Sequence, residues 1–121
     1  METNRVATKY DPLCIIGSEE ITTTDNYVVI GSLDISKHPS FCLQLINNHA
    51  SNVVTYKVEQ TFDGVNMIEV KSATDIAGTA NASFEDESIG TRVLISVKSK
   101  VSGNHASVKL FTRLKPASFI V

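Results

Sequence analysis

Apolar and polar residues alternate through residues 53–62, which is the pattern of a β-strand with one face in water. The apolar positions are Val54, Tyr56, Val58 and Phe62, and the polar positions between them are Thr55, Lys57, Glu59 and Thr61. Asp63-Gly64 follows, and a second apolar-rich run covers residues 65–70. This arrangement predicts a β-hairpin with a tight turn, because glycine accepts the positive φ that such a turn requires. It also places Tyr56 in the core.

Similar short runs, separated by turn-forming residues, fill the rest of the chain. Residues 40–46 are almost continuously apolar, which is typical of a central strand covered on both faces. Gly31 indicates a bulge or a close approach by another backbone. The expected strands are 13–16, 19–24, 27–35, 40–46, 53–62, 65–70, 80–84, 91–98 and 106–114, with the last two paired as a hairpin. With roughly 8–12 residues between strands and no βαβ alternation, the chain is predicted to be all-β: a single antiparallel β-sandwich, jelly-roll or Ig-like, of about eight strands.

The two ends of the chain lie outside this pattern. Residues 1–12 alternate weakly until Asp11-Pro12 breaks the alternation, so they form either an edge strand or an extended N-terminal arm that reaches a neighbouring subunit. Residues 115–121 end in an apolar run and act either as a docking tail or as part of the core. We therefore predict one domain over residues 1–121, with an arm at 1–12 and a tail at 115–121.

The bulk composition removes several classes of protein. A chain of 121 residues suits one domain with its own core. The net charge of −2 argues against a dedicated nucleic-acid binder, which usually carries a basic face. No apolar run approaches the roughly 20 residues of a membrane span, and the N-terminal residues lack the pattern of a secretory signal. We expect no nucleic-acid partner, no membrane and no secretion by signal peptide.

No catalytic, cofactor or metal site follows from local spacing. His38, His49 and His105 each fall at a predicted turn, and none has the spacing of a zinc site. Cys14 and Cys42 are expected to be reduced and to pack as small core hydrophobes, with a Cys14–Cys42 disulfide left open as the alternative. The acidic run 85–87 is expected to be a solvated loop. The sequence therefore predicts no enzyme and no cofactor.

Two strings of residues resemble parts of known β-sandwich families. Residues 56–67, Tyr-Lys-Val-Glu-Gln-Thr-Phe-Asp-Gly-Val-Asn-Met, are similar to a hairpin of discoidin-like, galactose-binding-type sandwiches and of small virion proteins of tailed phages. Residues 91–97, Thr-Arg-Val-Leu-Ile-Ser-Val, resemble an arginine-containing strand in both groups. The chain departs from the discoidin pattern, because Met67 stands where tryptophan is typical and the flanking cysteines are missing. The virion resemblance implies a capsid decoration, neck or tail component.

The first functional hypothesis is a non-enzymatic structural protein of a phage virion. It would act in many copies through contacts with itself and with other virion proteins, as a homo-oligomer located in the virion. The expected interface residues lie in the two ends of the chain: Val6, Tyr10, Phe119, Ile120 and Val121. The alternative is a carbohydrate-binding module that uses polar residues of strand-end loops: Asn48, His49, Asp63, Asn66, Asn104 and His105.

Overall fold

The computed structural model describes residues 15–115, with the side chains described from residue 19 onward. These residues form eight strands: β1 (Ile15–Thr22), β2 (Val28–Asp34), β3 (Ser40–Asn47), β4 (Val54–Thr61), β5 (Met67–Ile76), β6 (Asn81–Glu87), β7 (Arg92–Ser99) and β8 (Ser107–Leu114). Residues 15–115 contain no helix with the length and apolar character needed to cross a membrane.

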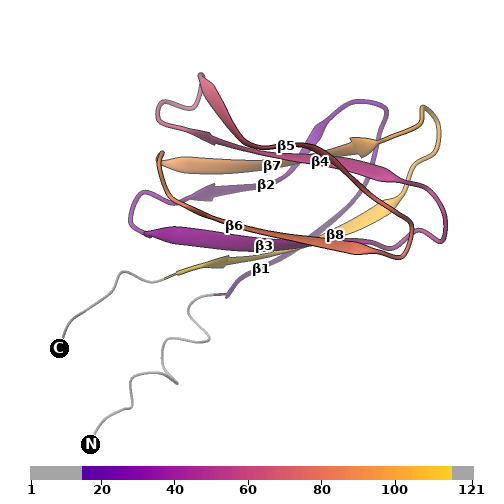
Figure 1. The fold of residues 1–121 in the computed structure, drawn as a ribbon, viewed down its shortest axis with the longest axis horizontal. Helices are drawn as coiled ribbons and strands as arrows, with labels where there is room; N and C mark the ends of the chain where they lie inside the picture. The colour runs from indigo at the N-terminus through magenta and orange to yellow at the C-terminus, as the bar shows by residue number, and fades with distance from the viewer. Residues whose placement is uncertain (1–14, 116–121) are drawn as a thin grey trace, which may run out of the picture.

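The strands form two antiparallel four-stranded sheets that lie one above the other (Figure 1). Sheet A has the order β1-β8-β3-β6, and sheet B has the order β2-β7-β4-β5. The chain changes sheet at every connection except the one between β4 and β5. This is the jelly-roll arrangement of a β-sandwich. The predicted antiparallel sandwich is confirmed, and the strand order selects the jelly roll over the Ig-like alternative.

The core lies between the sheets, where inward-facing residues alternate with outward-facing ones along each strand. Tyr56 of β4 lies in the core as predicted, and Val93, Ile95 and Val97 of β7 are fully buried. The buried apolar side chains are Ile30, Ile35, Phe41, Leu43, Leu45, Val54, Tyr56, Val58, Ile76, Val93, Ile95, Val97, Ala106, Val108, Leu110 and Leu114. The described strands thus close a core by themselves.

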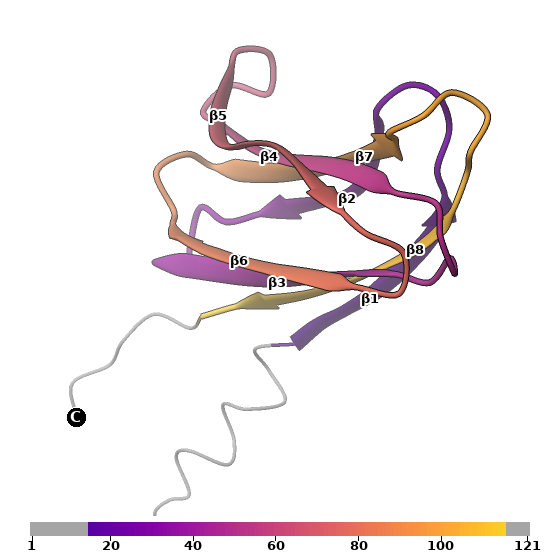
Figure 2. The same cartoon turned by 45° about the vertical axis from the view of Figure 1, so that its right-hand side comes forward.

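The hairpin formed by β4 and β5 is confirmed, but its turn is wider than predicted. Thr61 pairs with Met67, so a loop of residues 62–66 joins the strands, and Figure 2 shows this loop standing clear of both layers. Phe62 lies in the loop and is 62% exposed, so the prediction that it shares the buried face of β4 is wrong. The last inward position of β4 belongs to Gln60, which is fully buried.

Glycine shapes the edge where β1 meets β2. The sequence predicted a break at Gly17, but β1 continues through it, with a register shift between Ile15 and Gly17 that a bulge accommodates. The bulge predicted at Gly31 is confirmed, whereas the close approach there is made by a side chain and not by another backbone. The ladder to β7 shifts register between Val29 and Gly31, and a Cβ at Gly31 would lie 2.5 Å from the Cδ2 atom of Leu110 in the opposite sheet.

Three further predictions, one of a strand pairing and two of strand extents, are wrong. β7 and β8 are not a hairpin, because β7 pairs with β2 and β4 whereas β8 pairs with β1 and β3. β5 extends to Ile76, which pairs with Val54, and burial of the Ile76 side chain stabilises this longer strand. The acidic run 85–87 belongs to strand β6, because its backbone pairs with residues 40–42 of β3.

Candidate functional site

The expected interface residues Val6, Tyr10, Phe119, Ile120 and Val121 lie outside the described residues. The six candidate loop residues lie within them, and the jelly roll divides them between its two ends. Asn48, His49, Asn104 and His105 belong to the β3–β4 and β7–β8 connections at one end of the sandwich, whereas Asp63 and Asn66 belong to the β4–β5 loop at the other (Figure 1). A single site cannot use all six.

At the first end, polar side chains hold the loops to each other. The fully buried Asn47 donates from Nδ2 to the carbonyl oxygens of Asn52 (2.8 Å) and Ile76 (3.0 Å), and its Oδ1 accepts the N–H of His49 (3.0 Å). The Nδ1 atom of His49 accepts the N–H groups of Ser51 (3.0 Å) and Asn52 (2.8 Å). These side chains replace the strand ladder where the backbone leaves the sheets. Their first role is therefore structural.

A serine, a histidine and an aspartate also meet at this end. The Ser99 Oγ atom lies 2.9 Å from His105 Nδ1, and His105 Nε2 lies 4.0 Å from Asp25 Oδ1. Hydrogen bonds from the Gly103 N–H and the Ser102 hydroxyl lower the pKa of Asp25 below its ordinary value. Sequence spacing could not reveal this cluster, because its members come from the β1–β2 and β7–β8 regions.

The cluster does not have the geometry of a hydrolase triad. A catalytic serine must be exposed to substrate, but Ser99 is 3% exposed. Its Oγ atom also lies 2.7 Å from the Oγ1 atom of the buried Thr23, which accepts the N–H of Ala106 at 2.9 Å. The aspartate is beyond hydrogen-bond distance of the imidazole. We conclude that these groups fasten the β7–β8 connection to the β1–β2 turn.

At the other end, Asp63 organises the β4–β5 loop. Its Oδ1 accepts the N–H groups of Val65 and Asn66, both at 2.8 Å, and its Oδ2 accepts the Asn66 Nδ2 at 2.7 Å. The hydrogen bonds from the N–H groups of Asn66 and Val65 hold the pKa of Asp63 well below its usual range. Gly64 supplies the left-handed conformation of this loop, with φ +83°. The carboxylate is thus occupied by its own loop.

The loop is expected to open when this carboxylate is removed. In Asp63→Ala the amides of Val65 and Asn66 lose their acceptor, so their hydrogen exchange should become faster than in the parent protein. Because the folded pKa of Asp63 is lowered, its stabilising effect is fully present above the unfolded pKa of about 3.9 and is lost as the pH falls through the folded value. Exchange measured at neutral pH tests the prediction, and equal protection in both proteins would contradict it. Asp34→Ala, at the β2–β3 turn, serves as the matched control.

No group of three or more histidine, cysteine, aspartate or glutamate side chains within the described residues is arranged to hold a metal ion. Cys42 is a free thiol that is half-buried. The prediction that it packs in the core is wrong. It alternates with the buried Phe41 and Leu43, so its side chain lies on the outer face of sheet A. Ile15 of β1 and Cys42 of β3 pair with Arg113 of β8 from opposite sides. The backbones of Ile15 and Cys42 are therefore two strand spacings apart.

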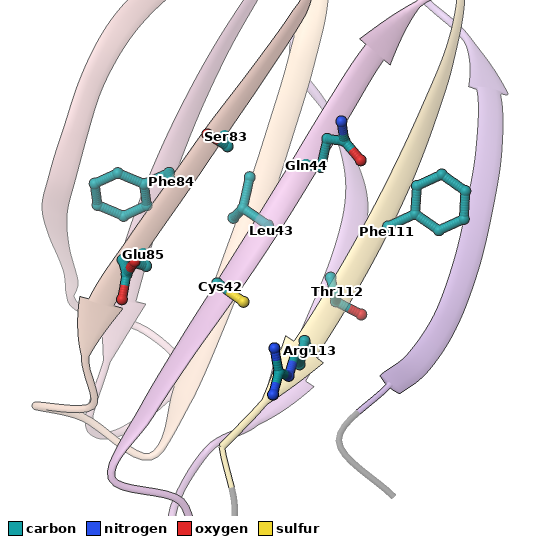
Figure 3. A pocket seen from close by; sticks show the side chains of 9 residues that line it. All are labelled: Cys42, Leu43, Gln44, Ser83, Phe84, Glu85, Phe111, Thr112 and Arg113. Carbon is teal, nitrogen blue, oxygen red and sulfur yellow. The ribbon is translucent and has the colours of Figure 1, made fainter. Parts of the chain in front are cut away.

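The outer face of sheet A is hollowed into a groove of about 690 Å³, shown in Figure 3. Small side chains at Cys42 and Ser83 leave the hollow, and the larger side chains of Gln44, Phe111 and Arg113 stand around it. Phe111 is 36% exposed on this face, and Lys109 places its Nζ 5.0 Å from the centre of the Phe111 ring. The groove could not be predicted from the sequence, because the residues that line it come from three separate strands, β3, β6 and β8.

The outer face of sheet B is more polar. Tyr27 lies just before the edge strand β2, and the Nζ atoms of Lys57 and Lys98 lie 4.5 Å and 5.0 Å from the centre of its ring. Partial burial raises the pKa of Tyr27, and nearby carboxylates add to the rise. The Oε1 atom of Glu59 lies 3.8 Å from the Nζ atom of Lys57. Charged side chains thus cover much of this face, whereas they only border the groove of sheet A.

A second exposed apolar surface lies at the β4–β5 end of the sandwich. Val65, at the tip of the loop, is 79% exposed. The large exposed apolar side chains there are Phe62, Val65, Met67, Ile68 and Ile89. The Thr91 hydroxyl donates to the Phe62 carbonyl oxygen at 3.0 Å, and this bond joins the β4–β5 loop to the β6–β7 loop that carries Ile89. Within residues 19–115, exposed apolar side chains therefore gather at this end of the sandwich as well as at the groove of sheet A. Clustered apolar side chains of this kind mark interaction sites.

Comparison with protein-family models gives no match, and comparison with curated protein sequences also gives none. Solved structures do resemble the chain, and they define its class as a jelly-roll β-sandwich. A protein of Bacillus endospore appendages, described as disulfide-linked pili, has 15% identity and a TM-score of 0.56, over 86% of this chain and 90% of that one. A chain of the Triatoma virus empty capsid has 13% identity and a TM-score of 0.52, over 88% and 92%.

The same fold also occurs in a protein with a different description. The Yersinia pseudotuberculosis-derived mitogen has 14% identity and a TM-score of 0.56, over 85% of this chain and 88% of the mitogen. At such identities the likeness shows the fold alone. Pilus and capsid proteins are therefore among the structural neighbours, but the function of this chain has to be argued from its own surface.

Proposed function

We propose that this chain is a non-enzymatic structural subunit that associates with copies of itself, as a component of a phage virion such as a capsid decoration, neck or tail protein. The observation that carries the proposal is the groove on the outer face of sheet A. Phe111, which is 36% exposed, and the half-buried Cys42 give this groove apolar surface among polar side chains such as Gln44. The pilus and capsid neighbours support the proposal, since both belong to multi-copy assemblies.

Two different apolar surfaces favour a head-to-tail mode of association. The groove lies on sheet A, and the second surface lies at the β4–β5 end of the sandwich. Contacts between unlike surfaces build rings or filaments, whereas a single self-complementary patch builds a two-fold dimer. The expected interface residues at the two ends of the chain, Val6, Tyr10 and 119–121, add further contacts in this proposal. The partners are other copies of the chain and other virion proteins.

Introducing a charge at Phe111 tests this proposal. Phe111→Asp should weaken self-association by about tenfold or more, because an aromatic side chain at the centre of an interface is a typical hot spot. Sedimentation velocity over a range of concentrations measures the effect. Val101→Asp, at an exposed position in the β7–β8 connection, is the matched control and should associate like the parent. An unchanged association of Phe111→Asp would remove the outer face of sheet A from the interface.

The carbohydrate-binding alternative predicts a different result. It would have to use Asn48, His49, Asn104 and His105 at one end of the sandwich, because Asp63 and Asn66 lie at the other. A glycan array probed with the parent protein, with and without calcium, separates the two functions. Specific glycan hits that are lost in Asn104→Ala would favour the alternative, and the absence of hits supports the structural role.

A further inference from the structure

We propose that the groove on the outer face of sheet A receives the segment 116–121 of a second copy of the chain. This inference rests on the proposed self-association and names the two surfaces that meet. The groove is the receptor, and Phe119, Ile120 and Val121 supply the inserted apolar side chains.

The groove suits an extended, uncharged peptide. Its floor is formed by β3 between two flanking strands, with Cys42 at the bottom and Phe111 on one side (Figure 3). Its charged residues, Glu85 and Arg113, have opposite signs, so the groove offers no net attraction for a charged peptide. Residues 117–121, Ala-Ser-Phe-Ile-Val, carry no charged side chain. In an extended segment Phe119 and Val121 point to the same side, so both can face the groove.

The segment begins next to the groove. Lys115 N–H donates to the Ser40 carbonyl oxygen at 3.0 Å, and Lys115 Nζ lies 3.6 Å from Glu85 Oε2. Glu85 lines the groove itself. The six residues beyond Lys115 reach roughly 20 Å when extended. That length is sufficient to cross from one molecule into the groove of a neighbour packed against this end of sheet A.

The direction of the chain favours a second copy over the segment's own groove. The groove is lined by residues 111–113, which precede Lys115, so the chain leaves the sheet heading away from it. The backbone of Lys115 is held on both sides, since His38 Nδ1 also lies 3.0 Å from the Lys115 carbonyl oxygen. Pro116 follows, and a residue that precedes proline prefers an extended conformation. A tight reversal into the chain's own groove would work against each of these constraints.

The native thiol in the groove allows a direct test by cross-linking. In a Cys14→Ser background, Val121→Cys places a new thiol in the segment, and Cys42 is the only other cysteine. Mixing a tagged and an untagged form of this variant under mild oxidation should give a disulfide between chains of both sizes. Adding Cys42→Ser should abolish the cross-link. Disulfides confined to single chains would overturn the inference.

Filling the groove provides a second test that does not depend on oxidation. Ser83→Trp should weaken association by about tenfold or more, because the indole occupies the space of the incoming segment. Asn81→Trp is the matched control, since Asn81 is exposed on the same face of β6 but does not line the groove. Equal association of Ser83→Trp and Asn81→Trp would overturn the inference.

Deleting residues 117–121 separates this inference from the proposed function. We expect the shortened chain to unfold at the parent temperature and to associate more weakly. A lower melting temperature with unchanged association would show that the segment completes the core instead. Association that persists without the segment would overturn the inference but leave the proposed function standing, whereas a parent chain that stays monomeric would overturn both.

Discussion

Replacing Gln60 by leucine is expected to lower the free energy of unfolding by about 4 kcal/mol. Gln60 is fully buried at the end of β4, and its amide binds the β6–β7 loop. Nε2 donates to the Glu87 carbonyl oxygen at 2.8 Å, and Oε1 accepts the N–H groups of Ile89 (2.8 Å) and Gly90 (3.1 Å). Leucine fills a similar volume but leaves these backbone groups without their partner.

Chemical denaturation of dilute protein measures this loss. Gln44→Leu is the matched control, because it makes the same change at an exposed position of the central strand β3. We expect the control to stay within about 0.5 kcal/mol of the parent. A Gln60→Leu variant as stable as Gln44→Leu would show that the buried amide does not hold the loop.

Replacing Asn47 by alanine is expected to lower the free energy of unfolding by about 3 kcal/mol. Asn47, like Gln60 at the opposite end of the sandwich, holds a loop in place through its buried amide. This amide joins the β3–β4 loop to the end of β5. Alanine removes three hydrogen bonds to backbone groups, two of them to carbonyl oxygens of Asn52 and Ile76.

The neighbouring residue provides the control for this variant. Asn48→Ala changes an exposed asparagine of the same loop and should be nearly neutral. Thermal unfolding of the two variants and the parent gives the comparison. Similar melting temperatures for Asn47→Ala and the parent would contradict the structural role of the buried amide.

The hydrogen-bond partners of these two buried amides could not be predicted from the sequence. The alternation of Val54, Tyr56 and Val58 identified β4, because a period of two residues is a local property of the chain. Gln60 continues the same phase inward, and nothing local shows that a distant loop offers three partners for its amide. Phe62 has the same phase as these residues, but β4 ends one residue earlier, so Phe62 lies in the exposed loop.

Sheet partners were harder to predict than strands. β7 and β8 are adjacent in sequence and well patterned, so a hairpin was expected, but the jelly roll places them in opposite sheets. Hydrogen bonds between Thr23, Ser99 and the β7–β8 connection fix this crossing, and their members are far apart in sequence. Likewise the groove needs Cys42, Ser83 and Phe111 on three strands of one sheet. The sequence contained each residue but not their juxtaposition.

The prediction that β3 is covered on both faces is wrong for the described residues, because its outward-facing Gln44 is exposed. The strand is central in sheet A, and its outward residues include Cys42 and Ile46, which are both half-buried. Within the described residues, no second layer covers this outer face. A neighbouring copy would supply that layer, so the nearly continuous apolar pattern of residues 40–46 agrees with a strand that is covered only in an assembly.

The central claim is that copies of this chain associate. Sedimentation velocity of the unmodified chain, from high dilution to the highest soluble concentration, tests it most directly. We predict that the weight-average mass rises with concentration from the monomer to species of many copies, as head-to-tail contacts require. A single monomeric species at every concentration would contradict the account.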